Sequence, residues 1–189
     1  MTGAGGSVGH PWLVVIDMQR VFGEAGSPWF APGAPAIEPT VARLVDGFGD
    51  RVALTRFVAP AEPVGAWVPY YELWPFALVP PTDEIWDLLP SIPARDHRVV
   101  TRTTFSKWDA ELALLVGHDM VLAGVSTDCC VLSTALAAAD AGVRVRVVAD
   151  ACAGVSEADH ERALAAMALY APLIEITTAD AVLAEVARA

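Results

Sequence analysis

Lysine is almost absent from this chain of 189 residues: Lys107 is the sole lysine, and 12 lysines and arginines together face 23 aspartates and glutamates. The formal net charge is −11. Nucleic acids and anionic membranes bind basic surfaces, so neither is expected as a partner. Long apolar runs are absent as well, because no stretch approaches the roughly 20 residues that a membrane-spanning helix needs. We therefore expect a soluble protein.

Cysteine is also scarce. The three cysteines are Cys129, Cys130 and Cys152, too few for a disulfide framework, and a bridge between adjacent residues would be strained. This usage predicts a reducing compartment and a cytoplasmic location. Residues 1–9 have neither the cationic start nor the apolar core of an export signal and are predicted to be a flexible terminus.

Metal and cofactor motifs are missing too. The four histidines, at positions 10, 97, 118 and 160, are scattered along the chain, and none has zinc-site spacing to another histidine or a cysteine cluster. The glycines of residues 3–6 precede the first apolar run, whereas a dinucleotide-binding loop follows a strand. We expect no metal and no cofactor.

The residues that are present, 54% of them apolar, predict an α/β fold. Short apolar runs alternate with helical patterns, as in a parallel sheet covered on both faces. The predicted structure is one domain over residues 1–189: a doubly wound, Rossmann-like, six-stranded parallel sheet with helices on both faces. The expected strands are 12–16, 51–55, 98–101, 120–123, 143–149 and 173–176, and the expected helices are 37–48, 110–116, 130–141, 157–169 and 179–186.

Residues 59–93 break this alternation. The segment holds eight of the 14 prolines and three of the six tryptophans, so it is neither a regular helix nor a disordered linker. We interpret it as a structured excursion over the ligand crevice. Its aromatic side chains are expected to pack on the sheet or form a subunit contact, with a substrate pocket as the slightly weaker alternative.

Ligand crevices of such sheets lie at the carboxyl ends of the strands, which directs attention to the residues just past each run. Cys130 lies where a strand meets a helix start, whose dipole favours a thiolate. Asp17 follows the first strand, and burial there would raise its pKa and suit it to act as a base. Arg102 follows the third strand and is the candidate cation, with Lys107 a weaker one. The alternatives are a buried structural cysteine, a turn-capping aspartate and a solvated arginine.

Four segments together resemble the isochorismatase-like cysteine hydrolase superfamily, over nearly the whole chain. They are Leu13-Val14-Val15-Ile16-Asp17-Met18-Gln19, Phe105-Ser106-Lys107-Trp108, Gly124-Val125-Ser126-Thr127-Asp128-Cys129-Cys130-Val131 and Val147-Val148-Ala149-Asp150-Ala151-Cys152 with His160.

This resemblance implies roles for individual residues. Cys130, rather than Cys129, is the implied nucleophile, and Asp17 is the implied base. A cis peptide is implied between Val125 and Ser126, with backbone N–H groups of this loop, including that of Cys130, forming the oxyanion hole. Arg102 takes the position of the family's lysine.

The resemblance also implies a function. We expect a cysteine hydrolase that cleaves a small-molecule amide or carbamoyl C–N bond through a thioester. The alternatives are a catalytically weakened small-ligand binder and an isochorismatase-type vinyl-ether hydrolase. The nicotinamidase zinc motif Asp-x-His is missing after Phe57, which makes nicotinamide a less expected substrate. Phe22, Trp67 and Trp108 are the candidate pocket residues, and a homo-oligomer, dimer or tetramer, is expected.

Overall fold

The computed structural model describes residues 10–94 and 96–188; the terminus predicted for residues 1–9 lies outside them. All strands of the main sheet run parallel in the order β3-β2-β1-β4-β5-β6, which confirms the predicted doubly wound architecture. The strands are β1 (Trp12–Ile16), β2 (Val52–Phe57), β3 (Arg98–Arg102), β4 (Asp119–Val125), β5 (Arg144–Ala153) and β6 (Ile174–Thr177).

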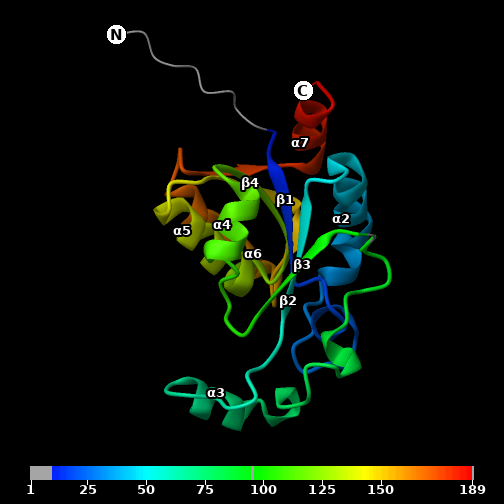
Figure 1. Ribbon diagram of the computed structural model, residues 1–189, viewed down its shortest axis with the longest axis vertical. Coiled ribbons are helices and arrows are strands. Elements are labelled where there is room, and N and C mark those ends of the chain that lie inside the picture. The colour runs from blue at the N-terminus through cyan, green and yellow to red at the C-terminus, as the bar shows by residue number, and fades with distance from the viewer. Residues whose placement is uncertain (1–9, 95, 189) are drawn as a thin grey trace.

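Helices cover both faces of this sheet (Figure 1). One face carries α2 (Ala34–Phe48) and α7 (Ala179–Val186), and the other carries α4 (Ala110–Val116), α5 (Leu132–Asp140) and α6 (Glu157–Ala168). Each face buries its own apolar core: Leu13 and Val15 point to one, whereas Val14 and Ile16 point to the other. Within the described ranges, no helix has the length and apolar character needed to cross a membrane.

The strand order reverses between β1 and β4, and this junction positions the site. The two strands pair in parallel up to Ile16 and Gly124. Gly124 has a φ of 114°, and a Cβ there would lie 2.1 Å from the carbonyl oxygen of Ile16. Only glycine allows this approach, which brings the residues after both strands to one crevice.

Several element boundaries differ from the expected ones. β2 continues to Phe57 and β5 continues to Ala153, because each of these two strands pairs with a neighbouring strand on both sides. The helix expected at residues 130–141 is replaced at its start by a π-helical turn, η3 (Thr127–Val131), before α5 begins at Leu132. A short helix, α1 (Arg20–Gly23), follows β1.

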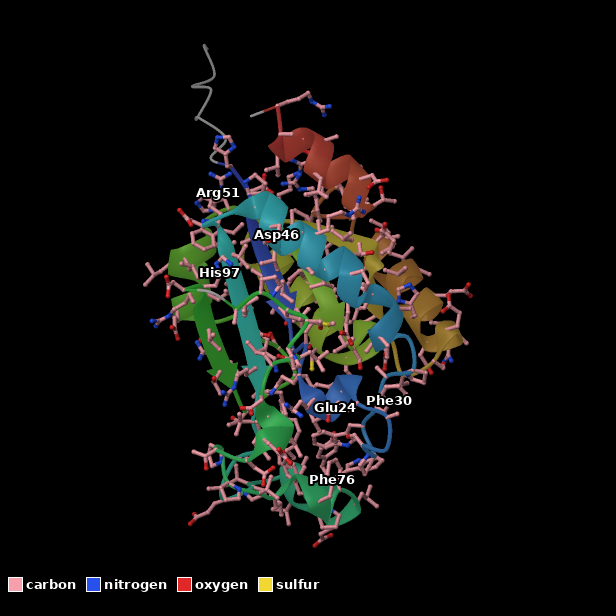
Figure 2. The ribbon with its side chains drawn as sticks, turned by 90° about the vertical axis from the view of Figure 1, so that its right-hand side faces the viewer. Glu24, Phe30, Asp46, Arg51, Phe76 and His97 are labelled. Atoms are coloured by element: carbon pink, nitrogen blue, oxygen red, sulfur yellow. The ribbon has the colours of Figure 1, made fainter. Side chains whose placement is uncertain are left out.

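The excursion 59–93 folds into α3 (Trp67–Leu73) and two 3-10 turns, η1 (Pro75–Ala77) and η2 (Glu84–Trp86). It lies beyond the end of β2, at one end of the molecule (Figure 1), and Phe76 belongs to this end in Figure 2. Trp86 and Tyr71 are fully buried. As expected, part of the aromatic content of the excursion therefore serves packing.

Candidate active site

Asp17 directly follows β1 and is completely buried. Its φ of 45° makes it the sole non-glycine residue with positive φ in the part of the chain that the structure describes. Such a conformation costs energy and is concentrated at functional sites. The hydroxyl of Thr55, on β2, donates to Asp17 Oδ1 at 2.6 Å and accepts from the Asp17 backbone N–H at 3.1 Å. These two bonds fix the orientation of the carboxylate.

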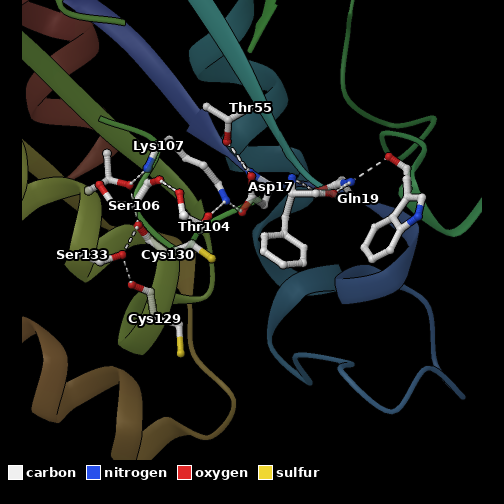
Figure 3. A network of polar contacts seen from close by, with 12 residues as sticks. Asp17, Gln19, Thr55, Thr104, Ser106, Lys107, Cys129, Cys130 and Ser133 are labelled. Atoms are coloured by element: carbon white, nitrogen blue, oxygen red, sulfur yellow. Dashed lines mark hydrogen bonds and ion pairs between the residues drawn. The ribbon is translucent and has the colours of Figure 1, made fainter. Parts of the chain in front are cut away.

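Lys107 is the cationic partner of this carboxylate (Figure 3). Its Nζ lies 3.0 Å from Asp17 Oδ2, and both side chains are fully shielded from solvent. The ammonium also donates to the carbonyl of Thr104 at 2.7 Å and lies 4.9 Å from the ring centre of Phe57. A buried charge of this kind is tolerated only when it is paired and hydrogen-bonded.

The assignment of Arg102 as the partner of Asp17 is therefore wrong. Arg102 pairs instead with Asp109 and, at 2.8 Å, with Glu111. β3 is the edge strand, two strands from β1, and the side chain of Arg102 turns toward the start of α4, where Asp109 is the N-cap. The loop after β3 brings Lys107 to Asp17.

Cys130 lies in the turn after β4, with 4% of its surface exposed. The peptide bond between Val125 and Ser126 is cis, and the Ser126 carbonyl accepts hydrogen bonds from the backbone N–H groups of Cys129 and Val131, both at 3.1 Å. Ser126 and Cys130 both line one cavity, and an oxyanion hole built from backbone N–H groups of this turn stays a prediction.

Thr134 connects Cys130 to Lys107. Its hydroxyl donates to the carbonyl of Cys130 at 2.6 Å and accepts from the backbone N–H of Lys107 at 2.9 Å. The loop that carries Lys107 is thus held directly on the first turn of α5.

The thiol of Cys130 is harder to ionise than the helix dipole alone predicts. Burial and the negative charge of Asp17 raise its pKa well above the ordinary value, while the Lys107 ammonium opposes them. The resting site therefore favours the protonated thiol of Cys130, next to the ion pair of Asp17 and Lys107. Such a thiol needs a base before it can attack.

A cavity of about 370 Å³ opens on this thiol. Aromatic side chains dominate its wall, and none of its lining side chains is an acid, a lysine, an arginine or a histidine. The lining residues are Phe22, Pro28, Trp29, Phe30, Phe57, Tyr70, Trp74, Phe105, Ser126, Cys129, Cys130 and Val155.

The predicted pocket residues are only partly found there. Phe22 lines the cavity. Trp67 lies behind the wall, with its ring centre 5.3 Å from that of Tyr70 and 5.1 Å from that of Phe105. Trp108 packs on the core of the other sheet face. Two side chains of the excursion, Tyr70 and Trp74, do line the cavity.

Sequence reasoning underrated Lys107 and missed Thr55, Trp29 and Tyr70 as parts of the site. For Lys107 a signal existed: the only lysine in a chain with 11 arginines lies in the Phe-Ser-Lys-Trp segment that carries part of the family resemblance. The wall aromatics come from loops whose course over the crevice depends on tertiary packing, so no local pattern identifies them.

Metal ligands do not gather at this site. Across residues 10–94 and 96–188, no three side chains of histidine, cysteine, aspartate or glutamate converge to hold an ion. The segment after Phe57 reads Val58-Ala59-Pro60-Ala61, which offers no metal-binding side chain. The residues present do not fit a zinc site of the Asp-x-His type.

Comparisons with known proteins identify the family and the fold of this chain. Residues 11–181 match the isochorismatase domain family. Isochorismatase domain-containing protein 2 of Xenopus laevis is 37% identical over 84 residues, which are 42% of this chain and 41% of that protein. The match thus spans about two fifths of the length of this curated relative.

Solved structures share the fold over nearly the whole chain. A cysteine hydrolase from Pseudomonas syringae superposes with a TM-score of 0.82 at 19% identity, covering 95% of this chain and 93% of the other. A pyrazinamidase of Pyrococcus horikoshii, solved in complex with zinc, gives 0.72 at 24% identity, covering 89% and 99%.

Proposed function

Because the chain belongs to the isochorismatase family, we propose that it is a cysteine hydrolase that cleaves the C–N bond of a small amide or carbamoyl compound. One observation carries the proposal: a buried carboxylate–ammonium pair lies beside a buried thiol, and that thiol lines an aromatic cavity. Nucleophile, base and cation are the groups that acyl transfer to a thiol requires.

The first half of the reaction forms a thioester. Asp17 takes the proton of the Cys130 thiol, and the sulfur attacks the substrate carbonyl carbon. Lys107, 3.0 Å from Asp17, stabilises the thiolate once the carboxylate has become neutral. Backbone N–H groups of the turn after Ser126 bind the oxyanion. The C–N bond then breaks, and the leaving nitrogen takes the proton from Asp17.

The second half regenerates the thiol. Asp17, again a carboxylate, removes a proton from water, and the resulting hydroxide attacks the thioester carbonyl. The C–S bond breaks, Cys130 recovers its proton, and a carboxylic or carbamic acid leaves. Each proton taken up by Asp17 is returned within the same half-reaction.

The side chains of the cavity wall narrow the range of possible substrates. Since none of the lining side chains carries a charge, a substrate carboxylate would find no partner there and would lose its hydration. We therefore propose an uncharged acyl substituent that packs against aromatic rings. This also disfavours a vinyl-ether substrate that carries carboxylates.

The pairing of Lys107 with Asp17 also bears on the ligand-binding alternative. That alternative was motivated by arginine in the place of the family's lysine. With an ammonium at the carboxylate, the full set of charged groups for turnover is present, which supports the enzyme over a binder.

Cys130→Ser tests the proposal. We expect ammonia release from amides such as benzamide and acetamide to fall by at least about 10³-fold, because a serine hydroxyl is a far weaker nucleophile here. Cys152→Ala, which removes a thiol outside the cavity, should retain activity. Circular dichroism checks that both variants fold. A Cys130→Ser variant with full amide activity would overturn the mechanism. Hydrolysis of a vinyl ether that survives loss of Cys130 but not of Asp17 would favour the isochorismatase-type alternative.

A further inference from the structure

Two neighbouring tyrosines of α3 occupy very different places. Tyr70 lines the cavity that contains Ser126 and Cys130. Tyr71 points into the core, is 1% exposed, and its hydroxyl has no hydrogen-bond partner among the described residues. The pair therefore offers one phenol that faces the nucleophile and one that does not.

The ring of Tyr70 is held in a fixed position by other rings. Its centre lies 5.2 Å from that of Tyr71, 5.3 Å from Trp67, 5.9 Å from Phe105 and 6.1 Å from Trp29. Aromatic pairs at such distances attract one another beyond the burial of their area. These contacts therefore hold the ring of Tyr70 in the cavity wall.

The hydroxyl of Tyr70 lies within electrostatic reach of the thiols. Burial, together with the charges that Cys129 and Cys130 would carry as thiolates, raises the pKa of Tyr70 to about 12. The phenol thus remains protonated across the neutral range and can donate a hydrogen bond. Most of the facing wall is hydrocarbon, so a donor here is available to a bound substrate.

We propose that Tyr70 is a catalytic residue whose phenol donates a hydrogen bond to the oxygen of the carbonyl group under attack by Cys130. The inference rests on the proposed cysteine hydrolase function. It gives the excursion 59–93 a chemical role in addition to forming cavity wall: α3 supplies a side-chain donor that is separate from the backbone of the turn after β4. An oxyanion that accepts from both would be stabilised as its charge develops.

Tyr70→Phe tests this role, with Tyr71→Phe as the matched control. We expect Tyr70→Phe to lower kcat/KM for benzamide by about tenfold or more, the worth of one hydrogen bond. The loss should be constant from pH 6 to pH 9, since a phenol that stays protonated adds no ionisation to the profile. Tyr71→Phe removes an unpartnered hydroxyl and should leave kcat/KM and the melting temperature unchanged.

A second measurement uses benzaldehyde, which a thiol converts into a thiohemiacetal: the C–S bond forms and the thiol proton moves to the oxygen. The Kd of benzaldehyde is measured from the degree to which it protects Cys130 against labelling by iodoacetamide. We expect Tyr70→Phe to weaken binding about tenfold. Equal kcat/KM and Kd in wild type and Tyr70→Phe would overturn the inference alone. A wild type that neither cleaves amides nor binds benzaldehyde would overturn the proposed function as well.

Discussion

Lys107 shows how strongly single residues depend on one another at this site. An ammonium without solvent contact is tolerable because Asp17 Oδ2 and the Thr104 carbonyl surround it. Removing either member of a buried ion pair leaves the other charge uncompensated, typically at about 3–5 kcal/mol. The two residues are therefore expected to contribute jointly to both stability and chemistry.

Lys107→Met and Arg102→Met separate the two candidate cations. We expect Lys107→Met to lose at least about 100-fold in amide turnover, because nothing then stabilises the thiolate or balances Asp17. Arg102→Met should stay within about tenfold of wild type, since its ion pairs to Asp109 and Glu111 are partly exposed and worth little. Ammonia release measures both. Greater loss in Arg102→Met than in Lys107→Met would contradict the site described above.

Asp17→Asn probes the pKa of the nucleophile. The negative charge of Asp17 raises the pKa of the Cys130 thiol and Lys107 lowers it, so removing only the negative charge should lower that pKa. We expect iodoacetamide to label Cys130 at lower pH in Asp17→Asn than in wild type, while turnover is lost with the base. Labelling rates between pH 6 and pH 10, followed by mass spectrometry, test the sign. A shift to higher pH would show that the carboxylate does not oppose ionisation.

At the scale of elements, the approach of β1 and β4 is the feature most sensitive to substitution. Gly124→Ala places a methyl group against the Ile16 backbone, at 2.1 Å before relaxation. Gly26→Ala is the matched control, because Gly26 also has positive φ, at 101°, but has nothing within 4 Å of an added Cβ. Positive φ costs each variant about 1–2 kcal/mol, and overpacking adds about 1–3 kcal/mol to Gly124→Ala alone.

Urea unfolding measures this difference. We expect the urea midpoint of Gly124→Ala to be lower than that of Gly26→Ala. Gly124→Ala should also lose activity, because the ends of β1 and β4, which Asp17 and Cys130 follow, shift apart. Equal midpoints would mean that the two strands can separate without cost.

The elements also show what could be predicted from sequence. The strands and their parallel direction were predictable because apolar runs such as Trp12–Ile16 alternate with amphipathic helices. Asp17 and Cys130 were predictable because strand ends meet at one edge. The path of the loop after β3 was not, since it depends on the hydrogen bond from the Lys107 backbone N–H to Thr134. Proximity to a strand end favoured Arg102, but Asp109 and Glu111 compete for its charge.

For the whole molecule, a homo-oligomer remains a prediction. The described surface includes exposed apolar side chains near the β6 edge, among them Leu169 and Leu173, and others around α3, including Val64 and Leu73. Apolar groups of this kind favour association, whereas a net charge of −11 opposes it at low salt. We expect size-exclusion chromatography with light scattering to give the mass of a dimer or tetramer at about 0.15 M salt. The mass of a single chain at high protein concentration would refute this.

The hydrogen bonds of Thr55 to Asp17 have a consequence for the order in which the chain is made. During synthesis β1 and β2 emerge first, and Thr55 can then orient the Asp17 carboxylate before Lys107 and Cys130 exist. A growing chain that closed this half of the sheet early would bury an acid with no counter-charge, which is unfavourable. The loop after β3 therefore removes this electrostatic penalty when it brings Lys107 to Asp17, and β4 with α5 then adds Cys130. Recovery of amide cleavage during refolding should accordingly coincide with the last step of sheet formation.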